Sequence, residues 1–314
     1  MPPDPTATAT ATATAREIVA GLCAAQASIA PKYFYDTAGS ALFEQITQLP
    51  EYYLTRTERA IMATHADALA LRIGPGATVI EAGAGNCEKA RTLCATIRPR
   101  CFVGVDIAAA FLQQAVAGLR REFPSLDVRS VVADLLDEIV LPADLPSGRR
   151  LVFYPGSSIG NFAPEAALGL LQRLRRLTDA DGALLIGVDL VKSKAILEAA
   201  YDDAAGVTAA FNLNVLRHIN RLLTADFDLA HWRHRSFFNE EQSRIEMHLE
   251  ARCATQVSWP TGCRNFRRAE RIHTENSYKY RVADFAGLLR RAGFGRHVCW
   301  TDAQQWFAVF LAEP

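Results

Sequence analysis

The sequence lacks an excess of either charge, a close pair of cysteines and an apolar run long enough to cross a bilayer. Its 34 Lys and Arg side chains balance 34 Asp and Glu side chains, so no basic field favours nucleic acid or an anionic membrane. Seven cysteines without a C-x-x-C pair indicate neither a disulfide framework nor a zinc site. No run approaches the roughly 20 apolar residues of a membrane span, and no signal-peptide pattern opens the chain. We therefore expect a cytoplasmic protein that binds a small molecule and no metal.

A third glycine is missing from the glycine-rich turn at residues 81–88. A β-branched strand pattern ends in Glu81, Gly83 and Gly85, and a helical pattern follows. Glycines allow positive φ angles there, and the helix offers free N–H groups at its N-terminus. Glu88 stands where a dinucleotide motif has its last glycine. The pattern E-x-G-x-G favours S-adenosylmethionine, which has no pyrophosphate, while an ordinary turn of an α/β protein stays open as the alternative.

Polar residues follow three further strand patterns. Asp106 ends the second strand and lies near the ~20-residue offset from Gly83 at which a carboxylate meets ribose hydroxyls. Asp134 follows the third strand and can accept from the exocyclic amine of an adenine, although both carboxylates can equally cap helices. Gly156 and Asn161 belong to the loop after the fourth strand, where substrate meets cofactor in a doubly wound sheet.

Five strand patterns that alternate with helices predict a parallel, right-handed α/β sheet. The chain then ends in a hairpin pattern, which is typical of the doubly wound, Rossmann-like methyltransferases that use S-adenosylmethionine. Between them, period-two patterns near residues 245–253 and 271–280 predict antiparallel strands of a second, α+β lobe. We expect a disordered Thr-Ala tail at 1–15, a cofactor domain at 56–193 and 281–314, and a substrate lobe at 16–55 and 194–280.

Two groups of side chains outside the sheet also suit a binding site. Tyr35 and Tyr52 lie in aromatic clusters before the nucleotide fold begins, where the alternative is that the rings attach an N-terminal arm to the body. Glu275 and Ser277, two residues apart, share one face of a predicted strand. A carboxylate beside a hydroxyl suits a ligand with a ring N–H, but solvent-facing polar residues have the same pattern.

From about Tyr33 to Leu311 the chain resembles the bacterial L-histidine Nα-methyltransferases of ergothioneine biosynthesis. The motifs that carry the resemblance are Phe34-Tyr35-Asp36, Leu49-Pro50-Glu51-Tyr52-Tyr53, Thr55-Arg56-Thr57-Glu58, Gly83-Ala84-Gly85, Gly156-Ser157-Ser158-Ile159-Gly160-Asn161, Tyr201-Asp202-Asp203-Ala204-Ala205-Gly206, Arg244-Ile245-Glu246-Met247 and Thr274-Glu275. It implies three methyl transfers from S-adenosylmethionine to the α-amino group of L-histidine, which give hercynine. The chain departs from the usual pattern at Asn86-Cys87, where Thr-Ser is common, and at Leu135, where an aromatic ring often flanks the adenine.

The resemblance also implies a role for individual residues. The cofactor-binding residues would be Gly83, Gly85, Lys89, Asp106, Asp134, Leu135 and Gly156. Tyr52, Asn161 and Tyr201 would hold the amine and carboxylate of histidine, with Tyr35 nearby, so that Tyr35 and Tyr52 are the candidate catalytic residues. Glu275 and Ser277 would bind the imidazole, and Met247 would form a wall of its pocket.

Other functions stay open at this stage. A methyltransferase for another amino acid or small amine would share the chemistry, and a protein that binds S-adenosylmethionine without catalysis would share the glycine turn. A dehydrogenase is the third alternative. The carboxylate of Glu275 favours histidine over tryptophan derivatives. We expect the protein to act as a monomer on a free amino acid.

Overall fold

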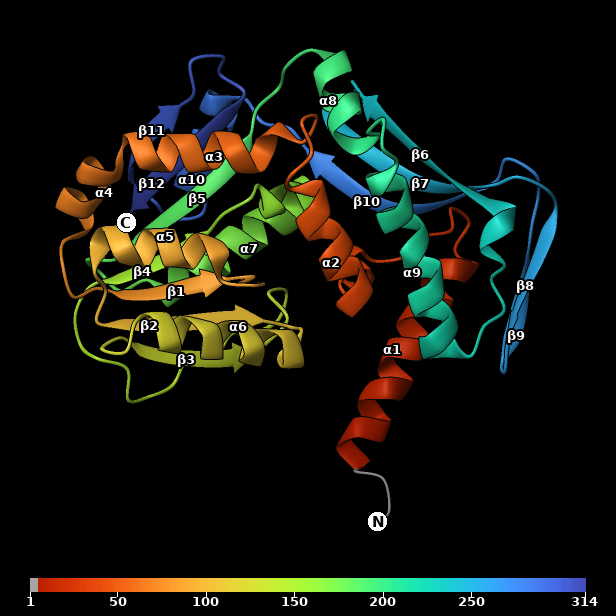
Figure 1. Ribbon diagram of the computed structural model, residues 1–314, viewed down its shortest axis with the longest axis horizontal. Helices are drawn as coiled ribbons and strands as arrows, with labels where there is room; N and C mark the ends of the chain where they lie inside the picture. The colour runs from red at the N-terminus through yellow and green to blue at the C-terminus, as the bar shows by residue number, and fades with distance from the viewer. Residues whose placement is uncertain (1–4) are drawn as a thin grey trace. The chain divides into compact units, whose positions relative to one another are not determined.

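The computed structural model describes residues 5–314, with side chains from Thr12 onward, and the chain divides into two compact units. One unit comprises the N-terminal residues up to Tyr53 together with Ser193–Ser277. The other comprises Leu54–Lys192 and Tyr278–Pro314. We call them the substrate unit, after the lobe that the sequence predicts to bind substrate, and the sheet unit, and we describe each by itself (Figure 1).

The sheet unit contains a seven-stranded sheet in the order β11-β12-β5-β4-β1-β2-β3. Its strands are β1 Thr78–Ala82, β2 Cys101–Asp106, β3 Asp127–Val132, β4 Arg150–Tyr154, β5 Ala183–Asp189, β11 Arg296–Thr301 and β12 Phe307–Glu313. The first five pair in parallel, whereas β12 runs antiparallel to both β5 and β11. Its helical segments are α3 Tyr53–Thr64, α4 Ala66–Ile73, α5 Glu88–Ile97, α6 Ala109–Glu122, η2 Ser158–Asn161, α7 Pro164–Leu177 and α10 Val282–Arg291. The predicted doubly wound, Rossmann-like sheet with its terminal antiparallel hairpin is confirmed.

Burial on both faces explains why these strands are almost continuously apolar. Every residue of β1 and β5 is buried, as expected for parallel strands covered by helices on each side. Each fully buried Val, Leu or Ile contributes about 1.5–3 kcal/mol relative to an exposed one. Ala82 at the end of β1 pairs with Val105 of β2, and Glu81 pairs with Phe153 of β4. The segments that follow these strands therefore begin at one edge of the sheet.

The substrate unit combines helices with two small antiparallel sheets. Its helical segments are α1 Pro5–Cys23, η1 Pro31–Phe34, α2 Thr37–Ile46, α8 Lys194–Tyr201, α9 Val207–Leu223 and η3 Leu229–His231. One sheet has the order β10-β7-β6 and the other pairs β8 with β9. These strands are β6 Trp232–Asn239, β7 Arg244–Ala251, β8 Thr255–Trp259, β9 Gly262–Phe266 and β10 Arg271–Tyr278. The two predicted strands correspond to β7 and β10. The sequence patterns did not reveal the other three strands, β6, β8 and β9.

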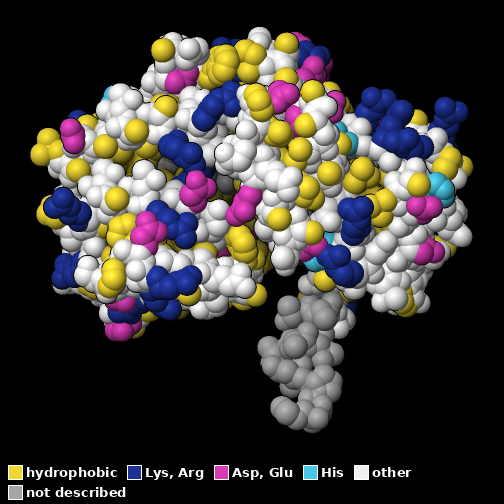
Figure 2. All heavy atoms as spheres, in the orientation of Figure 1, with side chains coloured by type: hydrophobic (Ala, Val, Ile, Leu, Met, Phe, Trp, Pro, Cys, Tyr) yellow, Lys and Arg dark blue, Asp and Glu magenta, His cyan; other side chains and the backbone are white. Residues whose placement is uncertain are grey.

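Residues 5–15 of the predicted disordered tail lie in α1, and residues 1–4 lie outside the described residues. Alanine has the highest helix propensity, which suits the Thr-Ala repeat to this helix. Within the described part of the chain, no helix is both long and apolar enough to cross a membrane. Figure 2 shows acidic and basic side chains interspersed over the sheet unit on the face drawn.

Candidate active site

The glycine turn after β1 requires its glycines. Gly83 has a φ of 71° and Gly85 a φ of 52°, angles that a residue with a Cβ rarely adopts. The amides of Gly83 and Ala84 both donate to the carbonyl of Val105, at 2.8 and 3.0 Å. The turn therefore folds back onto β2 and exposes bare backbone ahead of α5.

Asp106 holds this turn in place. Its carboxylate accepts from the Gly85 amide at 3.0 Å and from the Ala108 amide at 2.9 Å. The second bond closes a local turn ahead of α6, whose N-cap residue Ala108 receives no side-chain cap, so the capping alternative for Asp106 is wrong. Each carboxylate oxygen has two lone pairs, so these bonds leave acceptor capacity for ribose hydroxyls. That ribose contact stays a prediction.

Asp134 and Leu135 lie beyond the end of β3. Asp134 accepts from the Leu136 amide at 2.9 Å, as in a local turn. A Cβ added to Gly83 would lie 3.8 Å from the Leu135 side chain, so this leucine lies next to the glycine turn. It offers an apolar contact for an adenine, although it lacks the face of the aromatic ring that is common at this place.

Glu58 on α3 belongs to a motif that carries the resemblance but received no role from the sequence, yet it contacts two predicted cofactor residues. Its buried carboxylate pairs with the Lys89 ammonium at 2.6 Å and accepts from the Gly156 amide at 2.8 Å. Gly156 has a φ of 82° and lies in the loop after β4. Asn161 ends η2 in the same loop and is half-buried. The sheet unit thus presents Gly83, Lys89 and Gly156 from three adjacent segments.

Glu81, the acid of the E-x-G-x-G pattern, is buried and is the second-last residue of strand β1. Burial raises its pKa well above the usual value, and the neighbouring Lys89 opposes that rise. One of its carboxylate oxygens has no hydrogen-bond partner among the described residues. A neutral carboxyl fits this site because an unpaired buried charge would cost far more. Glu81 is therefore a buried acid directly before the glycine turn.

Four of the predicted substrate residues come together in the substrate unit. The rings of Tyr52 and Tyr201 make an edge contact with centroids 6.2 Å apart. Tyr201 and Ser277 share a buried hydrogen bond of 2.7 Å between their hydroxyl groups. Phe43 links Tyr35 to Tyr52, with centroid distances of 5.8 and 6.2 Å. Tyr35 is 37% exposed, whereas Tyr52 and Tyr201 are buried.

Local capping fixes two of these tyrosines. Asp36, next to Tyr35, caps α2 through the Gly39 amide at 2.7 Å and accepts from the Asn214 amide group of α9 at 2.8 Å. Asp203, two residues after Tyr201, accepts from the amides of Val207 and Thr208 at the start of α9. The aspartates of the motifs Phe34-Tyr35-Asp36 and Tyr201-Asp202-Asp203 therefore have a structural role, because each binds the start of a helix next to a tyrosine.

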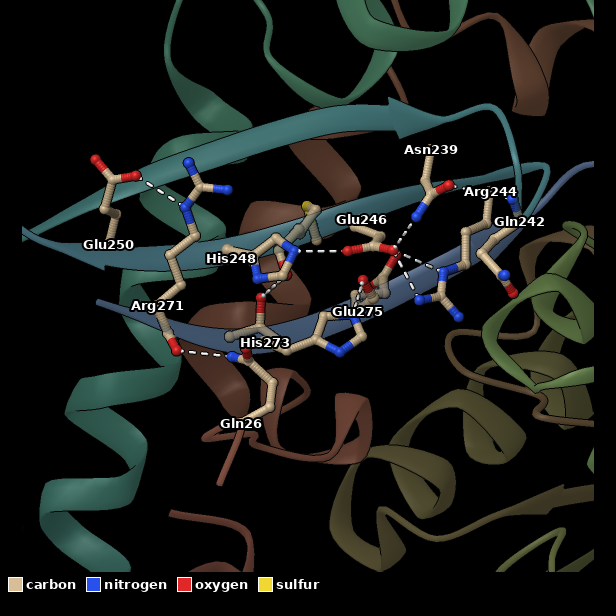
Figure 3. A network of polar contacts seen from close by, with 12 residues as sticks. Gln26, Asn239, Gln242, Arg244, Glu246, His248, Glu250, Arg271, His273 and Glu275 are labelled. Carbon is tan, nitrogen blue, oxygen red and sulfur yellow. Dashed lines mark hydrogen bonds and ion pairs between the residues drawn. The ribbon is translucent and has the colours of Figure 1, made fainter. Parts of the chain in front are cut away.

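Glu275 lies on β10, with Met247 on the neighbouring strand β7. Both side chains are buried, and the Thr274 hydroxyl donates to the Met247 carbonyl at 3.0 Å. Figure 3 labels Glu275 among the polar residues drawn on the two strands. Glu275 is thus a buried carboxylate, and the solvent-facing alternative for this residue is wrong.

The network around Glu246, His248 and His273 brings their ligand atoms within 4.8 Å of one another (Figure 3). Glu246 accepts from Arg244 at 2.7 Å and from His248 at 2.9 Å. Burial alone would raise the Glu246 pKa, but hydrogen bonds from Arg244, His248 and Asn239 lower it to about 2. Burial lowers the His248 pKa to about 4. The guanidinium already neutralises the carboxylate, so the arrangement favours an ion-paired network over a cation site.

Comparison with known proteins places this geometry in a family. The family model described as histidine-specific, SAM-dependent methyltransferase matches residues 14–314. The chain belongs to that family. It is therefore an S-adenosylmethionine-dependent methyltransferase, and the predicted family, enzyme class and cofactor are confirmed.

Curated relatives in this methyltransferase family cover nearly the whole chain. The histidine N-alpha-methyltransferase of Mycolicibacterium smegmatis is 41% identical over 304 residues, which are 95% of this chain and 94% of the relative. That of Mycobacterium tuberculosis is 38% identical over the same shares. Ergothioneine biosynthesis protein 1 of Neurospora crassa is 28% identical over 288 residues, 89% of this chain and 32% of that protein.

The sheet unit of this methyltransferase has groups that fit S-adenosylmethionine. The positive φ angles of Gly83 and Gly85 expose backbone, Asp106 keeps acceptor capacity, and Leu135 offers an apolar surface beside the turn. A lysine ammonium completes the set, because the cofactor's only anionic group is the carboxylate of its methionine part. Bound S-adenosylmethionine would supply an activated sulfonium methyl group.

Proposed function

We propose that this enzyme transfers three methyl groups to the α-amino nitrogen of L-histidine and forms hercynine, in the first step of ergothioneine biosynthesis. The family match and the names of the mycobacterial relatives support histidine as substrate. The observation that carries the proposal is the buried group in the substrate unit, in which Tyr52 contacts Tyr201 and Tyr201 bonds Ser277. Together with the buried Glu275, it offers both a place for an amine and a place for a ring N–H.

The chain's residues mainly have to align the nitrogen with the methyl group. Because the methyl carbon is already activated, orientation supplies most of what catalysis needs, and positioning of this kind can lower a barrier by about 7–11 kcal/mol. The amine must present its lone pair. The hydroxyls of Tyr52 and Tyr201 are uncharged, so they orient the amine without the charge that would hold it protonated.

The imidazole end of histidine gives specificity. We assign Glu275 and Ser277 to its two ring nitrogens and Met247 to an apolar wall. Glu275 is 9% exposed, and a buried carboxylate left without its partner costs about 1–3 kcal/mol or more. An amino acid without a ring N–H would offer this carboxylate no such donor, so we expect it to bind more weakly than histidine.

Three transfers from one active site require that partly methylated products stay bound. Each methylation brings the nitrogen closer to a permanent cation. The faces of Tyr35, Tyr52 and Tyr201 offer cation–π attraction of about 0.5–2 kcal/mol to such a group. We therefore propose that these three rings keep mono- and dimethylhistidine bound between transfers.

One experiment tests the function directly. The purified protein is incubated with L-histidine and excess S-adenosylmethionine, and products are identified by mass spectrometry. We expect trimethylhistidine as the main product, with mono- and dimethylhistidine as transient species. Methylation of another amine in a panel of amino acids, with histidine unchanged, would contradict the proposal, as would binding of S-adenosylhomocysteine without any turnover.

A further inference from the structure

Glu58 is a buried acid whose partners are residues already assigned to the cofactor. It is 4% exposed and lies in α3 of the sheet unit. One carboxylate oxygen pairs with the Lys89 ammonium at 2.6 Å, and the other accepts from the Gly156 amide at 2.8 Å. A single side chain thus ties α5, which carries Lys89, to the loop after β4.

The sheet makes room for this carboxylate at Gly187 of β5. A Cβ added at Gly187 would lie 1.9 Å from the nearer Glu58 oxygen. Real Cβ atoms do not come so close to another atom, so β5 needs a residue without a side chain here. The carboxylate therefore lies directly against the backbone of the central sheet, where it cannot easily move.

The two partners differ in their exposure to solvent. The Lys89 side chain is 33% exposed, whereas that of Glu58 is 5% exposed. Both line a pocket of about 380 Å³ that is open to solvent, together with Arg59, Glu88 and Phe153. The ammonium is thus held from the buried side and keeps donors for a ligand on its open side, because a lysine has three.

We propose that Glu58 is a positioning residue for S-adenosylmethionine: it fixes the Lys89 ammonium and the Gly156 amide, so that the cofactor carboxylate meets groups already in place. This inference rests on the proposed function for the identity of the cofactor residues. A free lysine side chain loses rotamer entropy when a ligand orders it. Because the ion pair with Glu58 already orders the Lys89 side chain in the folded protein, cofactor binding no longer has to order it.

The variant Glu58→Gln tests this role. Glutamine keeps an acceptor for the Gly156 amide but no longer attracts the Lys89 ammonium. We expect the Kd for S-adenosylhomocysteine, measured by titration calorimetry, to rise about tenfold, which corresponds to about 1.4 kcal/mol. The KM for S-adenosylmethionine should rise in parallel, with kcat and the KM for histidine within about twofold of wild type. Glu58→Asp should recover part of the affinity.

Glu88→Gln is the matched control. Glu88 lines the same pocket but pairs with the exposed Arg59 at 2.6 Å, so its loss should leave the Kd unchanged. Melting temperatures of all variants report on folding. Equal affinities for Glu58→Gln and Glu88→Gln would overturn the proposal, and so would a Glu58→Gln variant whose kcat falls while the cofactor KM stays the same.

A double-mutant cycle with Lys89→Met tests whether the two residues act together. If Glu58 acts through Lys89, the double variant should bind S-adenosylhomocysteine no more weakly than Lys89→Met alone. Additive losses would contradict the mechanism. The titrations contain no histidine, so a wrong assignment of the methyl acceptor would leave this result intact and would appear only in the product analysis.

Discussion

Single side chains carry most of the proposed chemistry, and each has a polar atom with a defined environment. Tyr201 is bound to Ser277, Asp106 to the glycine turn and Glu58 to Lys89. Glu275 is a buried carboxylate on β10. Because buried polar atoms are costly when they lose a partner, changes at these residues should give clear and separable effects.

The variant Glu275→Gln tests recognition of the imidazole. Glutamine keeps the size of the side chain but loses the charge, so hydrogen bonds from the ring N–H should weaken by about 1.5 kcal/mol or more. We expect the KM for histidine to rise at least tenfold, with the Kd for S-adenosylhomocysteine unchanged. Steady-state kinetics and calorimetry give the two values. The exposed Glu241 is the control, and unchanged histidine kinetics in Glu275→Gln would count against the assignment.

The variant Tyr52→Phe tests the role of one hydroxyl. The ring contact with Tyr201 persists, while the proposed bond to the amine is lost. We expect a fall of about tenfold to a hundredfold in kcat/KM for histidine and near-normal cofactor affinity, because uncharged hydrogen bonds are worth about 0.5–1.5 kcal/mol and misalignment adds to that. Single-turnover measurements would show the loss, and wild-type turnover would refute the role.

At the scale of elements, strands β7 and β10 carry a dense network of charges. On β7, Glu246 pairs with both Arg244 and His248, while Glu250 pairs with Arg271 of β10 and with Arg233 of the neighbouring strand β6. His248 lies between the rings of Phe237 and His273, at centroid distances of 5.3 and 4.8 Å. This packing keeps His248 neutral, since burial lowers its pKa to about 4.

The pH dependence of stability follows from that shift. Below pH 6.5 the unfolded chain binds a proton at His248 that the folded chain takes up only near pH 4, so stability falls as the pH falls through this window. Between pH 7.5 and 5 we expect His248 to account for a loss of about 2 kcal/mol. The lowered pKa of Glu246 acts in the same direction only below about pH 4.5.

The variant His248→Phe isolates this contribution, because the phenyl ring can keep the stack without titrating. Urea unfolding at pH 7.5 and pH 5 should give a smaller loss of stability in the variant than in the wild type. His231→Phe is the control, because the His231 side chain is 43% exposed. This variant should lose as much stability between pH 7.5 and pH 5 as the wild type does. If His248→Phe and the wild type lost the same free energy of unfolding between pH 7.5 and pH 5, the proposed role of His248 would be disproved.

At the scale of the whole molecule, the chain forms two units, and neither is continuous in sequence. Each unit is built from two separate stretches of chain, so the chain passes from one unit to the other three times. We propose that the sheet unit binds the cofactor and the substrate unit binds histidine. We also propose that one copy of the chain supplies every residue of the site.

A monomer should therefore be fully active. We expect light scattering to give a molar mass near the 34.4 kDa of the chain and the specific activity to stay constant on dilution. A dimer mass together with activity that falls on dilution would show that a second copy contributes to the site.

The sequence by itself determined the elements of the sheet unit, because strand and helix patterns arise from residues that are neighbours along the chain. The glycine turn, the acids at the ends of β1 and β2 and the terminal hairpin were all predictable in this way. Strand β6 was missed, since its residues Arg233 to Phe237 show no clean alternation of polar and apolar side chains.

Only the tertiary structure decided which distant side chains meet. Glu58 contacts residues 31 and 98 positions away along the chain, and Tyr201 contacts Ser277 across 76 positions. No local pattern encodes such pairs, because they depend on how the sheet and the helices pack. The same holds for His248, whose burial between two rings lowers its pKa. Local chemistry gives the candidates, and packing selects their partners and their charges.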